Sequence, residues 1–171
     1  MIEIRKENQE DYAPVRSIND MAFGQPTEGK IVDKIRSACK ETISLVAVKK
    51  GQVVGHIFFS PVSVKDDGKE IIGMGLAPMA VKPEFQKQGI GSLLVNEGIK
   101  ILKKYRCPFV VVLGHDKFYP RFGFKVASEY GLVPQWQGVP DEAFMVLFLN
   151  KSALGKVSGV VSYRNEFNEA M

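Results

Sequence analysis

The chain has 171 residues, of which 45% are hydrophobic and 25% charged, with a formal net charge of +4. This composition fits a globular domain, and two cysteines in a chain of this length exclude a disulfide framework or a Cys-x-x-Cys metal site. Without a signal-peptide pattern, an apolar run of about 18 residues or a basic cluster, the sequence predicts a cytoplasmic protein with no membrane or nucleic-acid partner.

The N-terminal part of the chain predicts one strand and two helices. Ile2 and Ile4 alternate with polar residues, which is typical of a short strand. Helical spacing of apolar residues begins at about Asp11, and Thr27 is placed to cap a second helix after the helix-breaking FGQP segment.

Three strands are expected next, joined by tight turns. Residues 44–62 form two β-branched and aromatic runs around Lys50-Gly51, a hairpin signal. A second turn at residues 66–68 leads into IIGMGLAPMAV, which predicts an apolar strand interrupted by glycine and by Pro78.

From Ile90 the apolar spacing is helical, and Ile90, Leu94, Gly98, Ile101 and Tyr105 share one face. The remaining elements are a buried strand at 107–114, a short helix or turn at 115–123, and a strand at 144–149. This alternation predicts an α/β domain with a mixed sheet. We expect one domain over residues 1–171, with a core in 1–149 and a less regular segment at 150–171.

The segment PEFQKQGIGSLL places Gly89 and Gly91 where the long helix begins. A helix N-terminus has unpaired amides and a positive dipole end, so it attracts phosphates, which approach more closely where Cβ atoms are absent. Lys87 adds charge and Ser92 a hydroxyl. The spacing is neither a P-loop nor a Rossmann turn, since Leu94 occupies the last position of Gly-x-Gly-x-x-Gly.

These residues resemble the acetyl-CoA signature of the GCN5-related N-acetyltransferases, the GNAT superfamily. Gln86, Gly89 and Gly91 occupy the defined positions of Gln/Arg-x-x-Gly-x-Gly/Ala, and Val81 and Pro83 supply the strand end before it. The FYPRFGF segment (118–124) resembles the second motif of the family, and together the motifs are most similar to the YhbS-like subgroup of predicted acetyltransferases.

The resemblance implies a GNAT fold, with a mixed, mostly antiparallel central sheet and helices on both faces. It also implies acetyl-CoA as cosubstrate, without a metal. Main-chain groups of Met79, Ala80 and Val81 would contact the pantetheine arm. The residues implied to cradle the pyrophosphate are Gln86, Lys87, Gln88, Gly89, Ile90, Gly91 and Ser92.

Acetyl transfer to an amine needs a base for the amine and a proton donor for the departing thiolate. By resemblance, Tyr119 is the expected donor, and the backbone N–H of Met79 is a hypothetical oxyanion donor. A shape-filling role for the Tyr119 ring is the alternative. The base stays open, because GMGLAPMAV has no carboxylate. The candidates are Glu28, His56, His115, Asp116 or water.

The expected function is therefore acetyl transfer from acetyl-CoA directly to an amine on a small molecule or peptide. The alternative is a non-catalytic acyl-CoA-binding or regulatory module on the same fold. Acceptor choice would be set by residues 22–30 and 130–143. Trp136 in the second segment, and Phe144 directly after it, are either pocket walls or core. Dimerisation is common in the family, so a homodimer is an open expectation.

Overall fold

The computed structural model describes residues 1–171 and forms two compact units. The first contains residues 1–60, 77–100 and 166–171, and the second contains residues 61–76 and 101–165. Strands β3 (Gln52–Asp66) and β4 (Lys69–Val81) carry residues of both units. That the chain behaves as one domain stays a prediction.

The sheet of the first unit begins with antiparallel strands. β1 (Ile2–Lys6) pairs with β2 (Ile43–Lys49), which pairs with β3. Lys50 and Gly51 connect β2 to β3 with φ values of 50° and 75°, and positive φ at both positions is what a two-residue type I′ turn requires. The predicted hairpin is confirmed.

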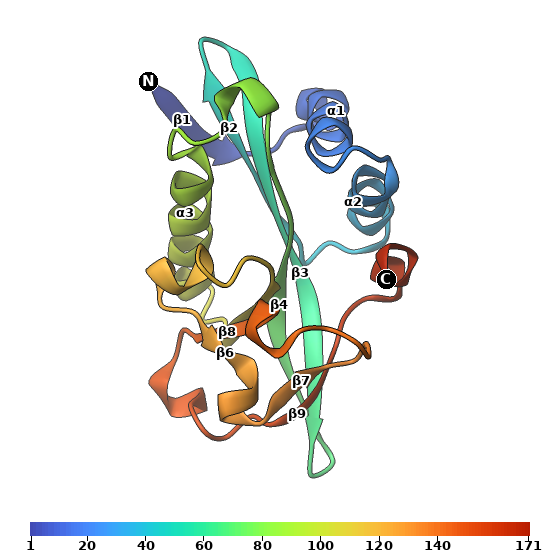
Figure 1. Cartoon of the computed structure of the whole chain (residues 1–171), viewed down its shortest axis with the longest axis vertical. Coiled ribbons are helices and arrows are strands. Elements are labelled where there is room, and N and C mark those ends of the chain that lie inside the picture. The colour runs from blue at the N-terminus through green and yellow to red at the C-terminus, as the bar shows by residue number, and fades with distance from the viewer. The chain divides into compact units, whose positions relative to one another are not determined.

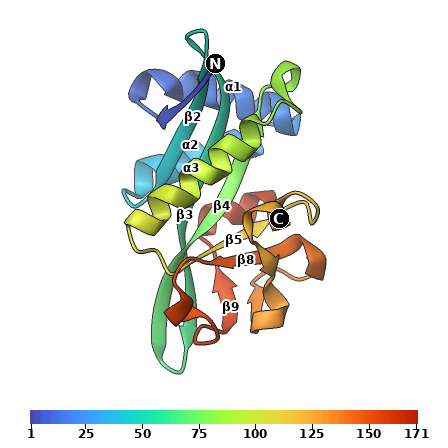
Figure 2. The ribbon, with the colours of Figure 1, turned by 90° about the vertical axis from the view of Figure 1, so that its left-hand side faces the viewer.

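Helices cover both faces of this unit's strands, as expected (Figure 1). The α1 helix (Tyr12–Phe23) and the α2 helix (Thr27–Ala38) lie on one face, and α3 (Ile90–Lys104) lies across the other (Figure 2). Alternation along β3 fits this arrangement. A Cβ built on Gly55 would come within 3.1 Å of Ile90 and 3.2 Å of Leu94 on α3, whereas the next residue, His56, contacts α1.

Two details of the expected helices are wrong. Thr27 is the first residue of α2 rather than its cap, and the N-cap residue, Pro26, makes no side-chain capping bond. Tyr105 follows the end of α3 and is 63% exposed, while Val95 and Leu102 supply apolar contacts on the buried face. The error arose because Tyr105 keeps the helical period after the helix has ended.

In the second unit, β4 pairs in parallel with β5 (Phe109–Leu113) at Met74–Leu76, and β5 pairs antiparallel with β8 (Phe144–Phe148). The short β6 strand (Lys125–Val126) pairs antiparallel with β8. The sheet pairings are mixed and mostly antiparallel, as predicted.

The expected interruption of β4 is wrong, since the strand continues from Lys69 to Val81. Its glycines make room for aromatic rings. A Cβ on Gly73 would lie 2.6 Å from the Phe109 ring, and one on Gly75 would lie 2.9 Å from the ring of Tyr163.

Residues 150–171 are more ordered than the sequence indicates. β9 (Gly159–Ser162) pairs antiparallel with β3 and in parallel with β7 (Leu132–Pro134). A 3-10 helix at Asn165–Ala170 follows. No helix in the structure combines the length and apolar character needed to cross a membrane.

Candidate functional site

The loop between β4 and α3 is closed by its own backbone and by two glutamine side chains. Lys82 N donates to Val54 O on β3 at 2.8 Å, which fixes the end of β4. Gln86 Nε2 donates to Val81 O at 3.0 Å, and Gln88 Nε2 lies 3.4 Å from Glu84 O. The Gln86 side chain therefore braces the loop against the strand from which it departs.

Left-handed backbone conformations alternate along this loop. Lys87 has φ 62° and Gly89 has φ 84°, and both residues are exposed. The carbonyl of Gly89 accepts the first helical hydrogen bond, from Leu93 N at 3.1 Å. Successive amides in such a turn, followed by the unpaired amides of a helix N-terminus, form a concave donor surface for anions.

The end of β4 lies next to this loop in the chain. Ala80 is buried, whereas Met79 and Val81 are partly exposed. Pro78 has no amide hydrogen and joins Ala77 through a cis peptide bond. The alternating burial leaves the side chains at 79 and 81 on the less buried side of the strand, as expected for β structure.

Tyr119 belongs to the second unit and begins a 3-10 helix, Tyr119–Phe122. Its side chain is 7% exposed and makes edge contacts with Phe118 and Phe124 at centroid distances of 5.0 and 5.6 Å. Burial raises the pKa of Tyr119 to about 12 and is the single cause of the shift. The phenol is therefore fully protonated at neutral pH.

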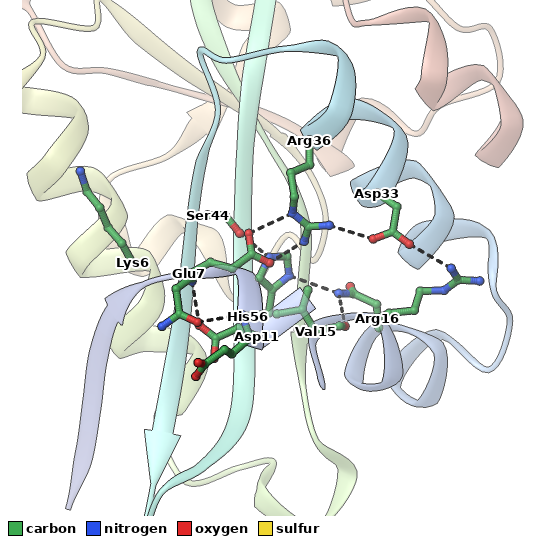
Figure 3. Close-up of polar contacts among 12 residues, drawn as sticks. Lys6, Glu7, Asp11, Val15, Arg16, Asp33, Arg36, Ser44 and His56 are labelled. Carbon is green, nitrogen blue, oxygen red and sulfur yellow. Dashed lines mark hydrogen bonds and ion pairs between the residues drawn. The ribbon is translucent and has the colours of Figure 1, made fainter. Parts of the chain in front are cut away.

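His56 lies fully buried between α1 and β2 (Figure 3). Asn19 Nδ2 lies 3.2 Å from His56 Nδ1 and donates to Val15 O at 3.0 Å, and Ser44 Oγ lies 2.8 Å from His56 Nε2. Because an amide nitrogen only donates, Nδ1 accepts and the ring proton is on Nε2. Burial first, and then the charge of Arg36, lower the pKa of His56 to about 3. Such a ring is a poor base for an amine.

The other candidate bases lie on α2 and in the segment after β5. Glu28, in the first turn of α2, accepts hydrogen bonds from Gln25 Nε2 at 3.1 and 3.2 Å. His115 and Asp116 are exposed after β5, and the His115 carbonyl accepts from Phe118 N and Tyr119 N. No cluster of three His, Cys, Asp or Glu residues with metal-ligand geometry is found.

Sequence reasoning missed the surroundings of Tyr119. The flanking aromatic residues come from the FYPRFGF motif itself, and Gly114, directly after β5, lies against the ring. A glycine at the end of a buried strand, followed by an aromatic segment, was the available signal.

Comparison with known proteins places this geometry in a family. Residues 40–126 match the model of the acetyltransferase (GNAT) domain. An uncharacterized N-acetyltransferase of Escherichia coli K12, YhbS, is 36% identical over 166 residues, which cover 96% of this chain and 98% of that protein. The chain belongs to the GNAT acetyltransferase family.

Two GNAT crystal structures are similar over nearly the whole chain. YhbS from E. coli in complex with CoA superposes with a TM-score of 0.91, covering 98% of this chain and 92% of that one. A GNAT acetyltransferase from Brucella melitensis in complex with acetyl-CoA is 35% identical, with a TM-score of 0.81 and 98% coverage of both chains. These structures confirm the GNAT fold predicted from the two sequence motifs.

Proposed function

We propose that this GNAT protein transfers the acetyl group of acetyl-CoA directly to an amine on a small molecule or peptide. The observation that supports this most strongly is the exposed β4–α3 loop, in which Lys87 and Gly89 adopt left-handed conformations just before the amides of α3. Relatives at 36% and 35% identity have been solved with CoA and acetyl-CoA.

In this proposal, acetyl-CoA supplies an activated acyl group, and the chain binds and orients it. The amides of residues 87–92 would hold the pyrophosphate, with the charge of Lys87 adding to the helix dipole. The brace from Gln86 to Val81 would keep those amides in place. Main-chain groups of Met79, Ala80 and Val81 would hold the pantetheine arm, and the Met79 N–H would polarise the thioester carbonyl.

Tyr119 is proposed to donate a hydrogen bond to the departing thiolate. Its pKa of about 12 exceeds that of a thiol, ordinarily about 8.5, so complete proton transfer from the resting phenol is uphill. A protonated phenol still stabilises negative charge that develops on sulfur as the bond breaks. The base for the amine stays open between Glu28, His115, Asp116 and water.

Thiol release tests the proposal directly. The purified protein is supplied with acetyl-CoA and a panel of polyamines, amino acids, aminoglycosides and peptides, free CoA is followed with a thiol reagent, and acetylated product is identified by its mass. An enzyme releases thiol in proportion to acceptor. Binding of CoA without turnover on any amine would favour the acyl-CoA-binding alternative, and no binding would contradict both.

A further inference from the structure

Gly114 stands where β5 ends, and its backbone does not require a glycine. Its φ lies outside the left-handed range in which other side chains are strained. Its N–H donates to Ala143 O at 2.9 Å, an ordinary hydrogen bond that any residue except proline could make. The reason for the missing side chain therefore lies in the space around it.

That space is filled by Tyr119. A Cβ on Gly114 would lie 2.5 Å from Cε2, 3.1 Å from Cδ2 and 3.5 Å from Cζ of the Tyr119 ring. The first of these distances is far below van der Waals contact. The Cδ2–Cε2 edge of the ring thus rests against the bare α-carbon of Gly114.

Two further aromatic rings pack against the Tyr119 ring and restrict its movement. Phe118 and Phe124 contact it edge to face, at interplanar angles of 85° and 71°, and Phe124 is itself fully buried. The backbone at Tyr119 is held in a turn in which Phe118 N and Tyr119 N donate to His115 O. A methyl group at position 114 must therefore turn or shift the phenol, and with it the hydroxyl.

We propose that Gly114 is a positioning residue, which sets the place of the Tyr119 hydroxyl by leaving the ring room against the end of β5. The inference rests on the proposed role of Tyr119 in the acetyl transfer. It assigns the glycine no contact with acetyl-CoA or the amine, so its effect should reach the reaction through the tyrosine alone.

A double-mutant cycle tests this dependence. Gly114→Ala and Tyr119→Phe are each expected to lower kcat at least about tenfold, while the KM for acetyl-CoA stays within about twofold. In the Tyr119→Phe background the ring still meets the added methyl, but no hydroxyl remains to be misplaced. Gly114→Ala should then change kcat by less than about twofold.

A second readout needs no acceptor. Carbon-13 labelling of the tyrosine rings, with the Tyr119 signal identified by its loss in Tyr119→Phe, follows the titration of the phenol by NMR. The wild-type ring should titrate near a pKa of about 12 because it is buried. In Gly114→Ala a displaced, wetter ring should titrate closer to the ordinary value of about 10.

The outcomes separate a failure of the Gly114 inference from a failure of the proposed function. Wild-type kcat and ring titration in Gly114→Ala would overturn the inference, as would an equal loss of kcat in both backgrounds, which indicates packing damage alone. Wild-type kcat in Tyr119→Phe would remove the tyrosine's role and the glycine's with it. Absence of turnover in the wild type contradicts the proposed function instead, and the titration still decides whether Gly114 positions the ring.

If Gly114→Ala does not fold, Phe124→Leu is the second variant, because it removes one of the edge contacts that hold the Tyr119 ring without adding an atom at 114. It should lower kcat and the phenol pKa, and its effect on kcat should vanish in the Tyr119→Phe background. An effect that persists there would overturn the inference.

Discussion

Asn19 Nδ2 lies 3.2 Å from His56 Nδ1, so an amide on α1 fixes the ring of a fully buried histidine on β3. Ser44 on β2 engages the other ring nitrogen. The polar contacts in Figure 3 thus join the helical layer to two strands through a neutral imidazole. Protonation would place a hydrogen on Nδ1 facing an amide that also donates, and this conflict adds to the cost of burying the charge.

Because of His56, the free energy of unfolding should decrease as the pH is lowered. The pKa is about 3 in the folded protein and about 6.5 in the unfolded chain, so below pH 6.5 the unfolded state binds a proton that the native state does not. The free energy of unfolding should drop by about 1.4 kcal/mol per pH unit as pH falls from about 6.5 towards 3. Above pH 6.5 this contribution is constant.

Urea unfolding at pH 7.5 and 5.0 measures this effect. His56→Gln should lose stability overall but show less of the pH-dependent loss, whereas the exposed His115→Gln should behave like the wild type. An equal loss between the two pH values in all three proteins would show that His56 does not cause it.

The Glu7–Arg36 ion pair should contribute more to stability than the exposed ion pairs of the chain. Arg36 donates two hydrogen bonds to Glu7, the side chains are 13% and 5% exposed, and Arg36 also stacks on Tyr12. Glu7→Gln removes the buried carboxylate and leaves Arg36 with Asp33, whose side chain is 42% exposed, so the free energy of unfolding should fall by about 2 kcal/mol.

The matched control is Lys34, which pairs with Glu169 at side-chain exposures of 52% and 46%. Lys34→Ala should cost no more than about 1 kcal/mol. Similar losses for Glu7→Gln and Lys34→Ala in denaturant titrations would contradict the difference in burial as the deciding factor.

Gly89 should be needed for coenzyme A binding. The matched control for Gly89→Ala is Gly24→Ala. Both glycines have positive φ, 84° and 68°, and a Cβ at either would meet nothing within 4 Å. Alanine should cause comparable strain at both, about 1–2 kcal/mol. Gly89→Ala should weaken CoA binding about tenfold or more in calorimetry, because the strained loop turns its amides away. Equal affinities of Gly24→Ala and Gly89→Ala for CoA would disprove the proposed cradle.

The Gln86 brace should contribute a smaller amount. An uncharged hydrogen bond is worth about 0.5–1.5 kcal/mol, so Gln86→Leu should weaken CoA binding about two- to tenfold. Gln88→Leu, whose contact with Glu84 O is longer at 3.4 Å, is the comparison variant and should have less effect. The reverse order of the two affinities would show that the brace does not hold the loop.

We predict that the chain unfolds as one domain. Since β3 and β4 carry residues of both compact units, local unfolding of one unit would end in the middle of two strands. Scanning calorimetry should show one transition with equal calorimetric and van't Hoff enthalpies. Two resolved transitions would contradict the prediction.

Local signals in the sequence predicted much of the fold. The turns at Lys50-Gly51 and Asp67-Gly68 were legible because residues that tolerate positive φ stood between β-branched runs. The start of α3 was legible from its apolar spacing and the preceding glycine.

Long-range contacts were the part that sequence reasoning missed. β9 is short, and its partners on β3 and β7 lie far from it in the chain, so no local pattern marks it. The setting of His56 depends likewise on Asn19 and Ser44, which come from other elements. Gly73 and Gly75 were misread as breaks because their roles are defined by rings from other parts of the chain.

The C-terminal segment has a consequence for synthesis. Residues 166–171 belong to the first unit, where Phe167 is buried and Glu169 pairs with Lys34 on α2. A ribosome makes these residues after everything else in the described chain. The contacts that residues 166–171 make in the first unit can therefore form only after residues 61–165 have been synthesised.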